Sequence, residues 1–312
     1  MKIAIIGCGA MGSIYAGLFA EAGHKVTAID LWREHLQAIS VTGLKLTGAS
    51  GDRVISGIST VFADDTEALA QLAEQDIFII ATKADGVEAA GRMITPLLGP
   101  EAHVLTIQNG MGSAENLAAI VPPAQLMIGV AQGFGAAIKA PGHIHHANMS
   151  LVRIGSYGGG ISIATDAMTQ CWKDAGFNAE AYADIDQLIW EKFICNVSLS
   201  GPCTISGLRV DELRSDPVWW QIALGCGLEA YNAGMAKQVV FSFDDAGAYI
   251  ARFAESLGTA RPSMALDHLA GRRSEIDVIN GIVPQLAAES DLDAPYNTVV
   301  SAMVRRLEEA FV

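Results

Sequence analysis

The chain has 312 residues, 51% of them hydrophobic, and a net charge of −14 at pH 7. That length allows two domains with sizeable cores, and the negative charge argues against nucleic acid and anionic membranes as partners. With no signal peptide, no bilayer-spanning apolar segment and five cysteines that lack zinc spacing, the sequence is typical of a cytoplasmic protein.

The first residues, KIAIIGCGAMG, join a short apolar strand to three glycines spaced G-x-G-x-x-G. A helical pattern follows and ends at Gly23, and this strand–turn–helix order is typical of a dinucleotide-binding unit. We expect Gly7 to allow a tight turn, Gly9 to let a pyrophosphate approach the backbone, and Gly12 to let the helix pack against the strand. Because a helix N-terminus attracts anions, the whole turn is predicted to bind the cofactor: Gly7, Cys8, Gly9, Ala10, Met11 and Gly12.

A second strand is predicted over residues 25–29, and Asp30 follows it directly. A carboxylate at this position suits the ribose hydroxyls of NAD and repels the 2′-phosphate of NADP. Arg33 comes slightly later and is the nearest cation that could reach such a phosphate. The residues favour NAD and leave NADP as the alternative.

The first half of the chain continues with alternating strand and helix patterns. Strands are predicted at residues 58–62, 76–81, 103–107, 127–130, 142–147 and 151–154, helices at 33–40, 65–73, 87–98, 114–120 and 164–176, and a hairpin at 44–56. This alternation predicts a doubly wound α/β fold, in which ligands gather outside the carboxyl ends of the strands. Lys83 and Asn109 each follow a predicted strand, so we expect both to line one crevice with Gly12.

The strand patterns stop near residue 183, and the rest of the chain is predicted to be helical. We expect a doubly wound, dinucleotide-binding Rossmann domain over residues 1–182 and an all-α domain over residues 183–312. Three histidines at 143, 145 and 146 have no carboxylate or cysteine beside them, so no metal site is predicted.

One helix of the second half, predicted over residues 185–199, is mostly apolar. It carries Lys192 and Asn196 four residues apart, and Ser200 lies four further on, so the three share one face. Because an unpaired buried lysine is costly, this stripe faces either a polar cleft or open solvent.

Two later segments carry further polar residues. Ser263 in RPSM is predicted to cap a helix, and a second helix is predicted over residues 274–288. Glu275 lies in the first turn of that second helix, where it is either a simple partner of the helix dipole or a functional side chain.

Together these motifs resemble the ketopantoate reductases (2-dehydropantoate 2-reductases) over nearly the whole chain. They are GCGAMG at residues 7–12, TKA with Lys83, QNGMG with Asn109, WEKFICN with Lys192 and Asn196, RPSM with Ser263, and SEIDVING with Glu275 and Asn280. The resemblance implies a Rossmann domain and a helical domain with the active site in the cleft between them. It also implies hydride transfer between a nicotinamide and a 2-oxo acid, in pantothenate biosynthesis.

The resemblance further implies roles for individual side chains. Lys192 is the general acid, and Glu275 holds the substrate hydroxyl or orients the lysine. Asn109 and Lys83 border the nicotinamide and its ribose, with Lys83 also near the substrate. The side chains that anchor the substrate are Asn196, Ser200 and Ser263.

Three positions depart from the family pattern. Asp30 stands near where NADPH-using members carry an arginine, and Ser200 and Ala260 replace asparagines that contact the far end of the substrate. An alternative is therefore an NAD-preferring sibling dehydrogenase that acts on another hydroxy or oxo compound in the oxidative direction. A non-catalytic nucleotide sensor or an opine-type dehydrogenase fits less well, because neither needs the motifs around Lys192 and Glu275. A homodimer is one option for its assembly.

Overall fold

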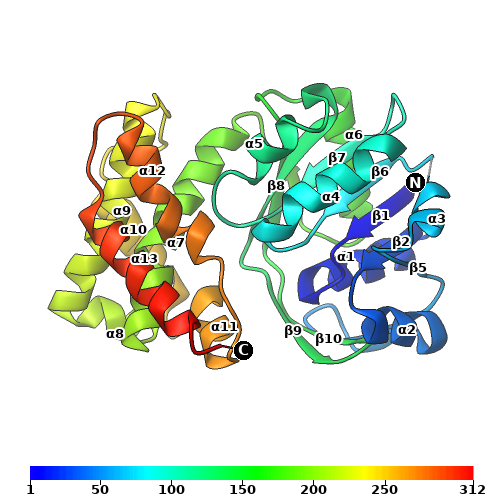
Figure 1. The fold of residues 1–312 in the computed structure, drawn as a ribbon, viewed down its shortest axis with the longest axis horizontal. Helices are drawn as coiled ribbons and strands as arrows, with labels where there is room; N and C mark the ends of the chain where they lie inside the picture. Colours follow the sequence, from blue (N-terminus) through cyan, green and yellow to red (C-terminus); the bar gives the residue numbers. More distant parts are fainter. Residues whose placement is uncertain (73, 312) are drawn as a thin grey trace. The chain divides into compact units, whose positions relative to one another are not determined.

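The computed structural model describes residues 1–72 and 74–311. They form two compact units: residues 1–108 and 113–185 make unit 1, and residues 109–112 with the chain from Asp186 onward make unit 2. Unit 1 combines strands and helices whereas unit 2 is helical, which confirms the predicted fold class (Figure 1). Within the described residues, no helix has both the length and the apolar character needed to cross a membrane.

An eight-stranded sheet forms the centre of unit 1, in the order β12-β11-β8-β7-β6-β1-β2-β5. Its strands are β1 (Lys2–Ile6), β2 (Lys25–Asp30), β5 (Ser59–Phe62), β6 (Ile77–Ile80), β7 (His103–Thr106), β8 (Leu126–Gln132), β11 (Leu151–Ser156) and β12 (Ala179–Ala181). The pair β8–β11 is antiparallel, and the other neighbouring pairs are parallel. The strand order reverses at β1, between β2 and β6, and ligands of such sheets bind outside the carboxyl ends at this point.

Helices cover both faces of this sheet. They are α1 (Ala10–Glu21), α2 (Arg33–Thr42), α3 (Thr66–Ala70), α4 (Val87–Ile94), α5 (Ser113–Ala118) and α6 (Ile163–Asp174), with short 3₁₀ turns at Ala84–Gly86, Thr95–Leu97 and Pro123–Gln125. Successive side chains of β1 point to opposite faces. Ile3 and Ile5 join the core that contains α1 and α6, whereas Ala4 and Ile6 join the core that contains α3, α4 and α5.

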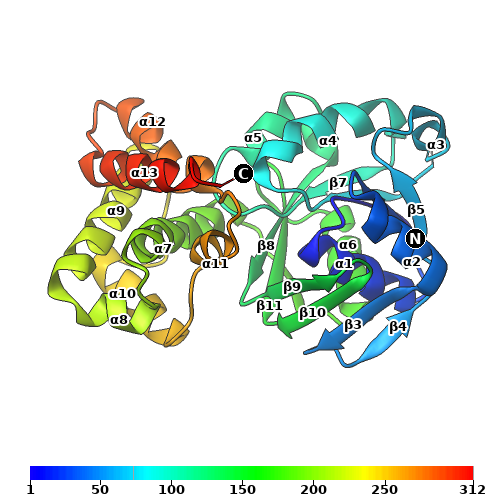
Figure 2. The same ribbon diagram turned by 60° about the horizontal axis from the view of Figure 1, so that its bottom comes forward.

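A second sheet packs on α1. Its strands β3 (Leu44–Gly48), β4 (Arg53–Ile55), β9 (Gly135–Ala140) and β10 (His143–Asn148) lie side by side in the order β4-β3-β10-β9 (Figure 2). The approach is close, because a β-carbon at Gly17 would lie 3.0 Å from Ile55 Cδ1 and 3.1 Å from Leu46 Cδ1, and these side-chain ends would have to shift. The predicted hairpin over residues 44–56 is confirmed as β3–β4. Strands β9 and β12 were not predicted, because the first has few large apolar residues and the second has only three residues.

Unit 2 is built from helices around one main core. They are α7 (Ile185–Ser206), α8 (Val210–Ser215), α9 (Pro217–Ala236), α10 (Ala246–Leu257), α11 (Ser263–Leu269), α12 (Val283–Ala288) and α13 (Pro295–Glu308), with 3₁₀ turns at Ile276–Val278 and Asn280–Ile282. Phe193, Ile194 and Val197 of α7 are buried in this core.

The prediction that the helix after residue 185 ends at residue 199 is wrong. Helix α7 continues through Gly201 and Pro202 to Ser206. A proline inside a helix costs about 3 kcal/mol, but tertiary packing offsets that cost. Here Gly201 packs so closely on Val300 and Asn280 that a β-carbon would overlap both, and Ser200 is only 4% exposed.

The predicted helix over residues 274–288 is also wrong in its first half, which consists of two 3₁₀ turns before α12. The carbonyl of Val278 accepts a hydrogen bond from Met111 N–H at 3.0 Å instead of serving an α-helical ladder. Pro284 then has no N–H to offer to the carbonyl of Asn280. The hydrogen bond from Met111 and the proline at position 284 together interrupt the helix.

Smaller differences concern helix ends. Ser263 is the first residue of α11, and the preceding Pro262 supplies the capping carbonyl to Leu266 N–H, so the prediction of Ser263 as a side-chain cap is wrong. The predicted helix over residues 65–73 ends at Ala70, with Asp65 as its cap, and residue 73 itself lies outside the described residues.

Candidate functional site

The glycine turn between β1 and α1 lies at the point where the strand order reverses. Gly7 has a positive φ of 90°, and a β-carbon on it would lie 2.5 Å from the backbone nitrogen of Thr82 at the end of β6. A β-carbon on Gly12 would overlap the carbonyl oxygen of Gly7. Both glycines are therefore required by the packing of the chain itself.

Gly9 differs, because a β-carbon there would meet open space in the described chain. It precedes α1 and makes no side-chain capping bond, so Ala10 and Met11 begin the helix without such a partner. An open position in front of a helix N-terminus is what a pyrophosphate requires. The turn thus fits a dinucleotide on two counts: the space above Gly9 and the uncapped first turn of α1.

A buried histidine supports this turn and was missed by the sequence analysis. Gly142 N–H donates to His35 Nδ1 at 3.0 Å, so the proton of the neutral ring must be on Nε2, which lies 2.9 Å from Ser13 Oγ. Ser13 Oγ in turn donates to the carbonyl of Cys8 at 2.9 Å. Burial lowers the pKa of His35, in agreement with a neutral ring.

Two further residues predicted to bind the cofactor lie in or near the turn, Cys8 and Lys83. The Cys8 thiol donates to the carbonyl of Ile5 at 3.6 Å, and burial raises its pKa far above the ordinary value, so it is no nucleophile. Lys83 is exposed and precedes the 3₁₀ turn that follows β6. It therefore lies at the same edge of the sheet as the glycine turn.

At the end of β2, Asp30 accepts a hydrogen bond from Trp32 N–H at 2.9 Å. The cation nearest in sequence, Arg33, lies over Phe62, the residue that pairs with Asp30 across the sheet, and its charge is already engaged. One terminal nitrogen of Arg33 donates to both carboxylate oxygens of Asp64, at 2.8 and 2.7 Å, and its guanidinium lies 4.3 Å from the centre of the Phe62 ring. The end of β2 therefore carries the Asp30 carboxylate, and the positive charge of Arg33 near it is paired with Asp64.

In unit 2, the side chains of Lys192 and Asn109 meet. Lys192 Nζ donates to Asn109 Oδ1 at 2.9 Å, although the two residues are 83 positions apart. Burial lowers the pKa of Lys192 to about 8, and the negative charge of Glu275 acts in the opposite direction. The result is an ammonium group that can give up a proton near neutral pH.

The segment from Asn109 to Gly112 is fixed by the 3₁₀ turn that follows Glu275. Met111 N–H donates to Val278 O at 3.0 Å. Gly110 has a φ of 82°, and a β-carbon on it would collide with the same carbonyl. Asn109 is thus placed beside Lys192 by backbone contacts with the segment that carries Glu275.

The remaining predicted site residues of unit 2 differ in how far they are buried. Asn196 is half-buried one turn after Lys192 on α7, Ser200 is buried, and Ser263 is exposed at the start of α11. Since Asn109 belongs to unit 2 and Gly12 and Lys83 belong to unit 1, the single crevice expected for these three stays a prediction.

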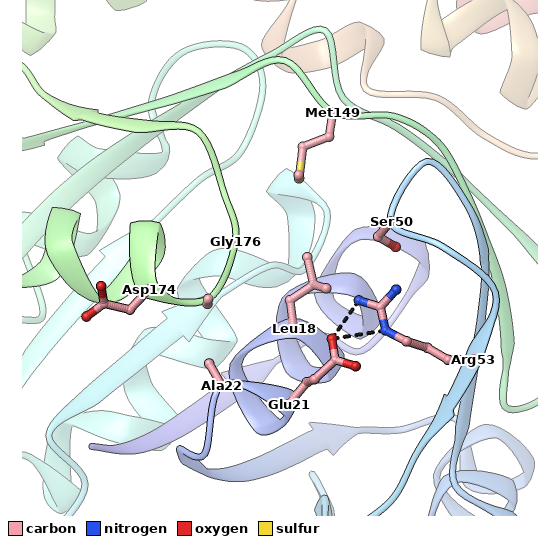
Figure 3. Close-up of a pocket in the computed structure, with 9 residues that line it drawn as sticks. Leu18, Glu21, Ala22, Ser50, Arg53, Met149, Asp174 and Gly176 are labelled. Carbon is pink, nitrogen blue, oxygen red and sulfur yellow. Dashed lines mark hydrogen bonds and ion pairs between the residues drawn. The ribbon is translucent and has the colours of Figure 1, made fainter.

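Unit 1 also has a cavity of about 440 Å³ between α1, β4 and the end of α6 (Figure 3). Its lining includes Glu21, Arg53 and Asp174, and Arg53 forms an ion pair with Glu21 at 2.6 Å. None of the predicted site residues is part of this lining. The described residues contain no group of three or more His, Cys, Asp or Glu side chains that could hold a metal ion.

Known families and proteins match this chain over its whole length. The family model "Ketopantoate reductase PanE/ApbA" matches residues 3–159, and "Ketopantoate reductase PanE/ApbA C terminal" matches residues 184–308. A 2-dehydropantoate 2-reductase of Archaeoglobus fulgidus is 26% identical over 307 residues, which cover 98% of each chain.

Two solved structures are similar throughout. A PanE/ApbA family ketopantoate reductase of Ralstonia eutropha has a TM-score of 0.88 and 27% identity, with 99% of each chain covered. D-mandelate dehydrogenase in a ternary structure with NADH and anilino(oxo)acetate has a TM-score of 0.89 and 25% identity, with 100% of this chain and 99% of the other covered.

Proposed function

The chain belongs to the ketopantoate reductase family, and from this premise we propose that it reduces the ketone of a 2-oxo acid, with ketopantoate as the first candidate substrate. It is an oxidoreductase that interconverts CH–OH and C=O groups with a nicotinamide cofactor. With ketopantoate as substrate, the reaction belongs to pantothenate biosynthesis. The observation that carries the proposal is the Lys192 ammonium, held by Asn109 and influenced by Glu275.

Lys192 acts as the general acid. When bound, the reduced nicotinamide supplies a hydride to the carbonyl carbon, and the π electron pair of the carbonyl moves to oxygen. Lys192 then transfers one proton to that oxygen, which completes the alcohol and leaves a neutral amine. A pKa of about 8 keeps the lysine protonated at neutral pH and still able to release its proton.

Asn109 and Glu275 adjust this acid from two sides. Asn109 Oδ1 accepts one N–H of Lys192, so the remaining N–H groups have fixed directions. Glu275 keeps the ammonium charged, because its negative charge opposes the effect of burial on the pKa. Around this centre, the side chains proposed to hold or border the substrate are Asn196, Ser200, Ser263 and Lys83.

The cofactor is proposed to bind residues 1–182, and the helical residues 183–312 carry the substrate site and catalysis. Within residues 1–182, Gly9 and the first turn of α1 would hold the pyrophosphate, and the Asp30 carboxylate would accept hydrogen bonds from the ribose hydroxyls. NAD is the preferred form, because the negative charge of Asp30 repels a 2′-phosphate and Arg33 is engaged by Asp64 and Phe62.

A second candidate is an NAD-dependent dehydrogenase for another 2-hydroxy or 2-oxo acid, working toward oxidation. The specific support is the similarity to D-mandelate dehydrogenase, solved with NADH and anilino(oxo)acetate. Ser200 and Ala260, which depart from the family pattern, are the places where the substrate pocket would differ.

Initial rates decide between these candidates. Ketopantoate is offered with NADH and with NADPH at equal concentrations, and mandelate-like 2-hydroxy acids are offered with NAD. We expect turnover with ketopantoate and a higher rate with NADH. Negligible turnover of ketopantoate, together with tight NADH binding, would reject the first candidate and support the second.

A further inference from the structure

Glu308, at the end of α13, is a buried carboxylate with three donors on a single oxygen. Its Oε1 accepts hydrogen bonds from Ser274 N–H at 2.7 Å, from Ser274 Oγ at 2.6 Å and from His268 Nε2 at 3.0 Å. The residue is only 8% exposed. A buried carboxylate that gathers three donors orders whatever carries those donors.

The donors belong to two segments of the proposed site. Ser274 directly precedes Glu275 in the chain, and both its backbone N–H and its hydroxyl donate to Glu308. His268 lies on α11, the helix that begins with Ser263. One carboxylate therefore ties together the backbone next to Glu275 and the helix that presents Ser263.

We propose that Glu308 is a positioning residue for the Lys192 site, which fixes the Ser274–Glu275 backbone and thereby the distance from the Glu275 charge to the lysine. This inference rests on the proposed function of Lys192 and Glu275. Glu308 itself touches neither substrate nor cofactor in this scheme. It acts through Ser274 on Glu275, and through Glu275 on the lysine.

The electrostatics agree with a charged, well-bonded Glu308. Burial raises the pKa of Glu308, but the hydrogen bonds from Ser274 and His268 outweigh burial and leave the pKa below its ordinary value. An ionised acceptor makes shorter and stronger hydrogen bonds than a neutral one. The carboxylate is thus the form that holds Ser274 most firmly.

Two ion pairs lie on or near the same segment. Arg272 pairs with Asp267 at 2.7 Å, and Arg305 of α13 pairs with Asp277 at 2.7 Å. The Asp277 side chain is 74% exposed and that of Arg305 is 49% exposed. Exposed ion pairs contribute little to order, so Arg305 offers a matched control on the same helix.

The experiment compares Glu308→Ala, Glu308→Gln and Arg305→Gln with the wild-type protein. We expect kcat for ketone reduction to fall about 10- to 100-fold in Glu308→Ala, because the acid site loses its alignment. NADH affinity should change less than about twofold, since the glycine turn belongs to unit 1. Glu308→Gln keeps the shape of the side chain and should retain more activity, and Arg305→Gln should behave as wild type.

A second readout separates positioning from a simple loss of stability. The pKa of Lys192 is measured by ¹⁵N NMR of its Nζ, and it also appears as the pH at which kcat declines. Wild-type activity should decline as the pH rises through about 8, where the acid loses its proton. In both Glu308 variants the pKa of Lys192 should be lower, because the Glu275 carboxylate is no longer held close to the lysine.

An unchanged pKa of Lys192 in both variants would overturn the proposal. So would a variant that melts at a lower temperature but has wild-type kcat and KM when assayed well below its melting temperature. An equal loss in Arg305→Gln would also overturn it. Failure of the proposed function looks different, since Lys192→Ala would then keep its turnover. The NMR titration tests the role of Glu308 in that case too, because the measurement needs no catalysis. If Glu308→Ala does not fold, the same titration is made on Glu308→Gln.

Discussion

The glycine turn of unit 1 and the Lys192 site of unit 2 are built in opposite ways. The turn consists of six consecutive residues, and its shape follows from backbone packing at Gly7 and Gly12. The lysine site gathers side chains from α7, from the segment 109–112 and from the segment after Arg273. The residues of the turn are consecutive in the chain, whereas the side chains of the lysine site come from segments far apart in the sequence.

This difference predicts how each region responds to substitution. Damage to the turn should appear in cofactor binding and stability, whereas damage to the lysine site should appear in the chemical step. A substitution in one region that changed cofactor affinity and the rate of the chemical step to the same extent would contradict this distinction.

The largest effect is expected for Lys192→Ala. Loss of a general acid should lower kcat about 10²- to 10⁴-fold, while NADH affinity measured by fluorescence titration stays within about twofold. Lys192→Arg should be almost as inactive, because an arginine keeps the charge but does not release its proton at neutral pH. Retained turnover in either variant would contradict the assignment of Lys192 as the acid.

A medium effect is expected for two alanine substitutions in the turn. Gly12→Ala should destabilise the protein by about 1–3 kcal/mol and weaken NADH binding, because the new methyl overlaps the Gly7 carbonyl oxygen. Gly9→Ala meets open space within the chain, so it should leave the melting temperature unchanged and weaken NADH binding alone. Calorimetry with and without NADH checks both, and equal NADH affinity in Gly9→Ala and wild type would exclude the pyrophosphate from that position.

The smallest effect is expected at the end of β2. Asp64→Asn frees Arg33 from an exposed ion pair worth about 0–1 kcal/mol, so the ratio of kcat/KM for NADPH to that for NADH should rise only a few-fold. The matched control Arg33→Gln removes the cation and should not raise this ratio. A rise of equal size in the control would show that Arg33 does not govern the choice of cofactor.

The two regions also differ in what the sequence revealed about them. The order of strand, glycine turn and helix was predicted correctly, because each step depends on residues a few positions apart. The segment after Arg273 was predicted as one helix although it contains Pro284, and nothing in its own residues shows that Val278 O accepts a hydrogen bond from Met111 N–H. His35 and Glu308 were missed for the same reason: their partners lie on other elements, and only the fold brings them together.

The hydrogen bond from Gly142 N–H to His35 Nδ1 spans 107 positions of sequence and has a practical consequence for protein engineering. Gly142 lies in the turn between β9 and β10, which would ordinarily be a convenient place to insert a tag or a reporter domain. Here that turn presents the N–H that selects the ring tautomer of His35, and the ring in turn reaches Cys8 through Ser13. An insertion at the tip of this hairpin should therefore disturb the glycine turn between β1 and α1, although the two are far apart in the sequence.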